Sequence, residues 1–294
     1  MSDPLGPSGE QFPDRLPSGI PGPPPPPAST FPSGIPTAGG AGSTATETIE
    51  WFGRPMRHFP VAVSSEAMAL AWANQEDGPA GAVVVVDHEI GPRGYHGAIW
   101  PTPPADSLAC SVILRPKLAV EEADSSWLAV GLVALGAAEA ASGHSLSLWW
   151  PADVIEGPSG PQSGEQGPER ELISAVKAEI QLGPGKVKSV VATMRFALTK
   201  LGLGRERRDD LLEQVVAAVD SVSDLLDDGA SAVAAAYEAR CSTLGKRLMV
   251  KLRPKGETRG TVRSIDRSAR LELASPTGMV ERVGIDQMME LKVI

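Results

Sequence analysis

The clearest pattern in the chain is two apolar runs separated by a loop that contains several glycines. The runs cover 82–86 and 110–114, consist largely of β-branched and other aliphatic residues, and are bounded by Gly and Pro. This pattern predicts two buried strands. The loop between them contains Arg93, and glycines allow backbone N–H groups to come close to a phosphate or carboxylate. The loop is therefore either a ligand clamp or an ordinary turn with a solvated arginine.

Three further patterns predict helices. Ser64 and Ser65 precede the segment 66–73, in which apolar residues recur four positions apart, as in a capped amphipathic helix. The segment 127–138 is apolar nearly all round, which predicts a helix buried against the sheet. Apolar residues at helical spacing over 211–226 predict a long amphipathic helix.

The last fifty residues have a different pattern, with short alternating segments separated by turns. Five such segments predict a small β-barrel, and they cover 248–252, 258–265, 270–273, 279–283 and 289–293. Bases outnumber acids along this region and predict a basic face, formed by Arg247, Lys251, Arg253, Lys255, Arg259, Arg263, Arg267 and Arg270. Charge complementarity then favours an acidic protein partner.

Changes in composition divide the chain into three parts. Residues 1–46 are rich in Pro, Gly and Ser and should be a disordered tail, which is either a spacer or a polyproline docking segment. We expect a catalytic-sized domain over 47–240, interrupted by a flexible Gly/Pro/Ser-rich loop over 156–170. The barrel domain covers 241–294.

Composition also bounds the function. The chain has 294 residues and a formal net charge of −9, which argues against general nucleic-acid binding. Its two cysteines are far apart and fit neither a zinc site nor a disulfide framework, so we expect no metal site. The sequence shows neither a signal peptide nor a membrane-spanning run, and we expect a cytoplasmic protein that does not enter a membrane.

The segment 87–100 resembles the biotinyl-adenylate loop of the biotin–protein ligases, whose pattern is D-H-Q-x-x-G-R-G-R-x-G-R-x-W. Four positions match, namely Arg93, Gly94, Gly97 and Trp100. Two later segments continue the resemblance. Residues 146–155 are similar to the family's L-K-W-P-N-D-V-L and retain Trp150 and Asp153, and residues 237–248 are similar to its Y-R-x-R-C-x-T-L-G-R-x-V hinge.

The resemblance implies an α+β fold of the biotin/lipoate ligase family. Its catalytic domain is class II synthetase-like, with a mixed β-sheet flanked by helices, and a small C-terminal β-barrel follows. The resemblance also implies a set of residues that bind biotin or its adenylate: Ser64, Ser65, Glu89, Arg93, Gly94, Gly97, Trp100, Trp150 and Asp153.

Several positions depart from the family pattern in ways that change the chemistry. The family's two ligand-binding lysines fall on Trp149 and Leu172, and its asparagine falls on Ala152. An indole has one neutral donor and cannot offset the charge that develops when a carboxylate attacks a phosphate. We therefore assign no catalytic residue with certainty.

Two of the pocket's expected amides are replaced by acids. Glu89 stands in place of a glutamine, and Glu66 follows two serines where the family has S-T-N. A strand near Arg195 replaces the family's G-I-G-I-N. Arg195 could supply a replacement cation, although a solvated arginine at the end of a strand is the favoured interpretation, and Lys177 lies close to the second lysine position.

Three functional hypotheses follow. The first is a pseudoenzyme, a weak or inactive paralogue of the biotin–[carboxyl carrier protein] ligases that still binds biotin, biotinyl-adenylate, a carrier domain or another ligase-fold subunit. The second is an active, AMP-forming biotin–[acetyl-CoA-carboxylase] ligase that uses biotin, ATP and Mg²⁺ and has rebuilt its charge with Arg93, Arg195 or Lys177. The third is lipoate or other acyl transfer, which would ordinarily use a cysteine or lysine nucleophile. Cys110 lies inside an apolar run, so we expect it to be structural.

Overall fold

The computed structural model describes residues 47–95, 106–157 and 171–294. The predicted tail 1–46, Gly97 and Trp100, and most of the predicted loop 156–170 lie outside these residues. Among the described residues, two sheets are present, one of eight strands and one of five.

The larger sheet has the strand order β1-β2-β3-β4-β8-β7-β6-β5. Only β2 and β3 run parallel, so the sheet is mixed, as predicted. Its strands are β1 Ile49–Trp51, β2 Arg54–Ala62, β3 Val83–Glu89, β4 Ser107–Leu114, β5 Leu146–Trp149, β6 Asp153–Glu156, β7 Leu172–Gly183 and β8 Lys186–Ala197. The two apolar runs are therefore strands, β3 and β4, and they pair with Val85 opposite Cys110.

The described residues form four α-helices: α1 Ser65–Gln75, α2 Ser125–Ser142, α3 Arg208–Asp227 and α4 Ala230–Glu238. Short 3-10 turns, η3 Val120–Glu122, η4 Thr199–Leu201 and η5 Arg205–Arg207, lie between them. The predicted cap of α1 is confirmed, since the Ser64 hydroxyl oxygen accepts a hydrogen bond from the Ala67 amide at 3.1 Å. The other two helix predictions correspond to α2 and α3.

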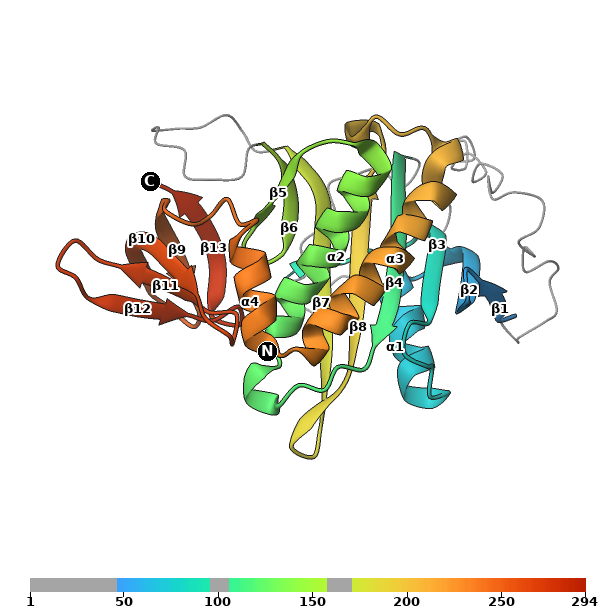
Figure 1. Ribbon diagram of the computed structural model, residues 1–294, viewed down its shortest axis with the longest axis horizontal. Helices are drawn as coiled ribbons and strands as arrows, with labels where there is room; N and C mark the ends of the chain where they lie inside the picture. Colours follow the sequence, from blue (N-terminus) through green and yellow to red (C-terminus); the bar gives the residue numbers. More distant parts are fainter. Residues whose placement is uncertain (1–46, 96–105, 158–170) are drawn as a thin grey trace, which may run out of the picture.

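The helices cover opposite faces of the sheet. α2 and α3 lie side by side across one face (Figure 1), and α1 packs on β3, β4 and β8. Alternation along β3 explains the division, since successive strand residues point to opposite faces. Val83 and Val85 belong to the cluster beneath α2, whereas Val84 and Val86 pack with Trp72 of α1.

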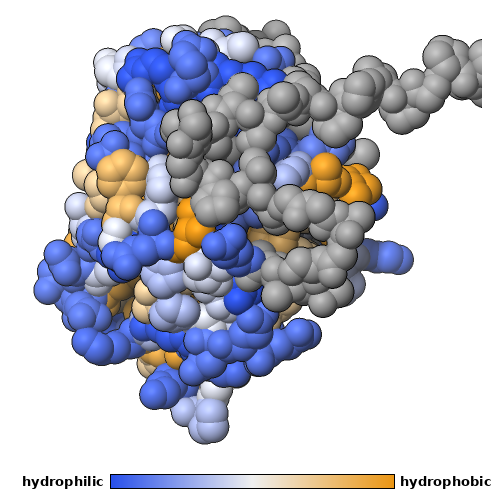
Figure 2. Space-filling view, turned by 90° about the vertical axis from the view of Figure 1, so that its right-hand side faces the viewer, coloured by the Kyte–Doolittle hydropathy of each residue, from blue (hydrophilic) through white to orange (hydrophobic). Residues whose placement is uncertain are grey.

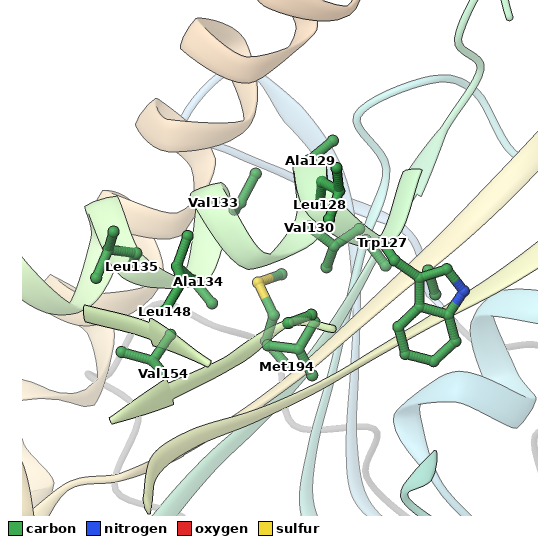
Figure 3. Close-up of a cluster of buried hydrophobic side chains, with 14 of the residues drawn as sticks. Trp127, Leu128, Ala129, Val130, Val133, Ala134, Leu135, Leu148, Val154 and Met194 are labelled. Atoms are coloured by element: carbon green, nitrogen blue, oxygen red, sulfur yellow. The ribbon is translucent and has the colours of Figure 1, made fainter. Parts of the chain in front are cut away.

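The main core lies between α2 and the sheet. In Figure 3 the α2 side chains Leu128, Val130 and Ala134 lie above Leu148 and Met194 of the strands, and each is 0% exposed. Among the described residues only α2 has the length and apolar composition of a membrane span, and 72% of that stretch is buried inside the fold. This burial is typical of a core helix.

The second sheet contains the C-terminal strands in the order β12-β11-β10-β9-β13, and all its pairs are antiparallel. The strands are β9 Arg247–Leu252, β10 Glu257–Ile265, β11 Leu271–Ala274, β12 Val280–Val283 and β13 Met288–Val293. The five predicted segments therefore form the separate small C-terminal unit of the expected α+β fold, which lies at the end of the larger sheet that carries β5 (Figure 1).

Candidate ligand-binding site on the α1 face

The candidate site begins at the first turn of α1, where the helix leaves backbone N–H groups without intrahelical partners. One of them is satisfied by Glu89 at the end of β3. The Ser65 amide donates to Glu89 Oε1 at 2.7 Å, and the Ser65 hydroxyl donates to the same oxygen at 2.9 Å. Ser65 is 0% exposed and Glu89 6%. A carboxylate is favourable at this position because the positive end of the helix dipole lies there.

Arg195 of β8 completes the surroundings of this carboxylate. Its guanidinium donates to Glu89 Oε2 at 2.8 Å, and the residue is only 4% exposed. Burial lowers the pKa of Arg195, and the adjacent Glu89 carboxylate opposes that shift. The expectation of a solvated strand-end arginine is therefore wrong, because the acid that replaced the family's glutamine provides a buried partner for it.

Hydroxyl groups extend the network across the sheet. The Ser111 hydroxyl donates to Ser65 Oγ at 3.0 Å and lies 2.8 Å from Thr193 Oγ1. All three side chains are buried. Sequence reasoning missed Ser111 and Thr193, although a polar residue inside an otherwise apolar strand is a signal that could have found them.

A second acid–base pair lies beside the first. Lys177 Nζ of β7 lies 2.6 Å from Glu66 Oε1 and 3.4 Å from Glu179 Oε2. The Lys177 and Glu66 side chains are 20% and 12% exposed. Glu66 is the acid that replaced the second expected amide, so both substitutions of an amide by an acid coincide with a base on a neighbouring strand.

The positions of the two family lysines hold side chains without charge. Trp149 ends β5 opposite Asp153 and is 9% exposed. Leu172 starts β7 opposite Ile155 and packs against the core. Asp153 accepts a hydrogen bond from the Val176 backbone, but burial dominates and raises the pKa of its carboxyl to about 6.

Two other motif positions, Trp150 and Ala152, are buried against neighbouring parts of the chain. The Trp150 indole, 1% exposed, donates to the Ala269 carbonyl at 2.9 Å, and its backbone N–H donates to Thr243 Oγ1 at 3.0 Å. Ala152 is buried where the backbone of α2 passes, since a Cβ added at Gly131 would lie 3.3 Å from the Ala152 Cα.

The glycine loop is described only at its beginning. Arg93 is exposed, and Gly94 is half-buried. The Tyr95 hydroxyl donates to the Ile285 carbonyl of the C-terminal unit, and its ring makes an edge-to-face contact with Trp127 at a centroid distance of 5.2 Å. Burial and the nearby Asp286 raise the pKa of Tyr95.

A separate charged cluster lies on the opposite face. Asp87 Oδ1 accepts a hydrogen bond from Arg208 at 2.9 Å, and Asp87 Oδ2 lies 3.0 Å from His58 Nε2. Burial raises the pKa of Asp87, but His58 and Arg208 together outweigh that effect and hold it below its usual value. Within the described ranges, no three His, Cys, Asp or Glu side chains are arranged to hold a metal ion.

The surface beside β1 and β2 is mainly hydrophilic, with a few separate hydrophobic patches (Figure 2). Exposed apolar side chains near the ends of β2 and β3 include Val61, Val63 and Ile90. These exposed apolar side chains do not identify a ligand or partner for this surface.

Comparison with known proteins gives a consistent fold assignment. No protein-family model matches the chain. Two curated relatives, both named bifunctional ligase/repressor BirA, come from Bacillus spizizenii and Bacillus subtilis. Each is 26% identical over 106 residues, which is 36% of this chain and 32% of the relative. The aligned part thus spans about a third of the length of these relatives.

Solved structures match over a larger part of the chain. The biotin protein ligase of Aquifex aeolicus in complex with biotin and ATP has a TM-score of 0.61 at 15% identity, over 81% of this chain and 99% of that chain. A biotin protein ligase-like protein of unknown function from Silicibacter has a TM-score of 0.52 at 13% identity, over 78% and 94%. The resemblance inferred from the motifs is therefore confirmed, and the chain has the fold of the biotin protein ligases.

Proposed function

We propose that this protein is a paralogue of the biotin protein ligases that transfers biotin weakly or not at all. The main support for the proposal is that the two basic side chains on strands near the site already form ion pairs within the chain. Arg195 is held by Glu89, and Lys177 is held by Glu66. A base that already neutralises an adjacent acid adds little net charge to the site, so neither replaces a missing lysine.

The expected loss of rate follows from the reaction class. When a carboxylate attacks the α-phosphate of ATP, negative charge develops that a positioned cation stabilises by several kcal/mol. Trp149 and Leu172 supply no charge at the two lysine positions. Loss of one such cation corresponds to a rate reduction of at least about 100-fold.

Biotin and ATP remain the natural ligands to test, because they are bound in the Aquifex aeolicus structure. If this chain binds an acyl-adenylate, we expect Ser64 and Arg93 to contact it, since the donors of Ser65 are bonded to Glu89. Arg93 is the cation of the glycine loop and would contact the phosphate.

An active ligase is the alternative, and it would rely on Arg93, an exposed cation in the described part of the loop. Acyl transfer through a cysteine has less support. Cys110 is 0% exposed, and burial raises the pKa of its thiol to about 12, which leaves almost no thiolate at neutral pH.

The proposed partner is a biotin carboxyl-carrier domain or another ligase-fold subunit, with no role for nucleic acid. The structure weakens one argument for this partner, namely that a basic face of the C-terminal unit attracts an acidic protein. Four bases of the predicted basic face are paired with acids: Lys251 with Glu290, Arg259 with Glu257, Arg267 with Glu122 and Arg270 with Asp266. Electrostatic attraction of an acidic partner then depends on the remaining bases.

The test is a biotinylation assay with ATP, biotin and an apo carrier domain. We expect the protein to react at least about 100-fold more slowly than the Aquifex aeolicus ligase. The double variant Trp149→Lys/Leu172→Lys should be faster than the unaltered protein, whereas Trp51→Lys on the edge strand β1 is a matched control that should not be. Transfer by the unaltered protein at the rate of the Aquifex enzyme would refute the proposal.

A further inference from the structure

The α1 face contains a group of donors that converge on one point. They are the Ser65 amide, the Ser65 hydroxyl and the Arg195 guanidinium, and all three are directed at the carboxylate of Glu89. A converging set of buried donors is the usual way in which a protein binds a carbonyl or carboxylate oxygen of a ligand. Here that oxygen belongs to the chain itself.

We infer that Glu89 is an internal ligand of the α1 N-terminus and that, with Arg195, it determines which head groups this site accepts. The inference rests on the proposed function and deepens it, because it names the ligand class that the site rejects. Ligands that bind through a neutral urea, amide or carbonyl oxygen are excluded, since the donors they need are already satisfied.

The energetic argument concerns what an incoming ligand would have to displace. A neutral oxygen that replaced Glu89 would exchange a charge-assisted hydrogen bond for a weaker one. It would also leave Glu89 Oε1 buried without its two donors, and moving the Glu89 side chain away would separate it from Arg195, which is strongly unfavourable for a buried ion pair. Glu89 should therefore keep the Ser65 and Arg195 donors in competition with biotin, whose head group is a neutral urea.

The second pair gives independent support for a change of specificity rather than simple decay. Random loss of a binding site would leave acids and bases unmatched. Instead, Glu66 and Lys177 repeat the arrangement of Glu89 and Arg195, with an acid from the end of β3 or the start of α1 facing a base from β7 or β8. Each of the two acids that replaced an expected amide therefore has a base as its partner, and Lys177 also lies near a third acid, Glu179.

The test removes the internal ligand together with its counter-ion. The double variant Glu89→Gln/Arg195→Ile restores the residues of the family pattern at both positions and leaves no unpaired buried charge. Isothermal titration with biotin should show a gain in association constant of at least about tenfold over the unaltered protein, because one well-made hydrogen bond to a ligand is worth about that factor.

A matched control removes a buried ion pair from the opposite face. The double variant Asp87→Asn/Arg208→Leu should leave the affinity for biotin unchanged. A folded Glu89→Gln/Arg195→Ile protein that gains no affinity for biotin would overturn the inference. If biotinylation by the unaltered protein is also slow, the proposed function survives that failure.

A measurement on the unaltered protein covers the case in which the double variant does not fold. Amides in the first turn of a helix have no intrahelical acceptor and normally exchange fast with solvent. Because Glu89 holds the Ser65 amide, its hydrogen exchange without ligand should be as slow as that of the core strands. Fast exchange at Ser65 would contradict the inference.

Discussion

The two faces of the large sheet bury different kinds of side chain. The α2 face is filled by aliphatic side chains, with one charged cluster around Asp87 at its edge. The α1 face buries hydroxyl groups and the Glu89–Arg195 ion pair between a helix end and two strands. Apolar packing stabilises the fold, whereas a buried polar network contributes little net stability and is retained for specificity in some proteins. The comparison therefore separates the face whose packing stabilises the fold from the face to which we assign a role in ligand selection.

The largest effect on the free energy of unfolding should come from removing only one partner of the Glu89–Arg195 ion pair. Arg195→Ile leaves the Glu89 carboxylate buried with the donors of α1 alone, and we expect a loss of about 3–5 kcal/mol in the free energy of unfolding. The double variant Glu89→Gln/Arg195→Ile should recover most of that loss, since it removes both charges. Urea unfolding of the three proteins measures both values. A double variant as unstable as the single one would show that the pair serves stability rather than selection.

A slightly smaller effect is expected from the core on the α2 face. Leu128→Ala removes a side chain that is 0% exposed and should cost about 2–5 kcal/mol, because the surrounding side chains cannot fully close the cavity. Leu132→Ala, at a half-buried position of the same helix, is the matched control and should cost less. Thermal or urea unfolding tests this. Equal costs at the two positions would contradict the view that burial beneath α2 sets the cost.

The smallest effect concerns a single carboxyl group. The pKa of Asp153 is raised to about 6 in the folded protein, so the group binds its proton more tightly there than in the unfolded chain. The free energy of unfolding should therefore fall as pH rises from about 4 to 6, and the full cost, at most about 3 kcal/mol, is present above pH 6.

Asp153→Asn should accordingly stabilise the protein at pH 7.5, because the amide oxygen can still accept the bond from the Val176 backbone. The advantage should shrink as the pH falls below 6 and vanish near pH 4. Unfolding curves at several pH values measure it. A stability difference that does not vary with pH would mean that Asp153 is not desolvated.

Much of the fold could be predicted from local pattern. The runs that became β3 and β4, the apolar α2 and the capped α1 each carry a periodicity that one segment of chain displays by itself. The strand order could not be read this way, since β8 inserts between β4 and β7 through contacts far apart in sequence.

The candidate site shows the same limit. Motif resemblance located Ser65 and Glu89 but could not show that the acid at 89 and the base at 195 are partners, because 106 positions separate them and neither position has a local pattern of charge. For the same reason Arg195 was expected to be solvated. Trp150 was expected to contact a ligand, and its indole bond to Ala269 depends on the docking of the C-terminal unit, which no single segment encodes.

The contact of Tyr95 with the C-terminal unit has a thermodynamic consequence. Because its hydroxyl bonds the Ile285 carbonyl and its ring rests on Trp127, the segment that leads into the glycine loop belongs to the junction between the two sheets. Any ligand that reorients this segment must do work against the junction. By reciprocity, a partner that shifts the C-terminal unit changes the affinity for that ligand by the same factor. If a ligand binds at this segment and a partner at the C-terminal unit, the Tyr95 hydroxyl bond would couple the two binding equilibria.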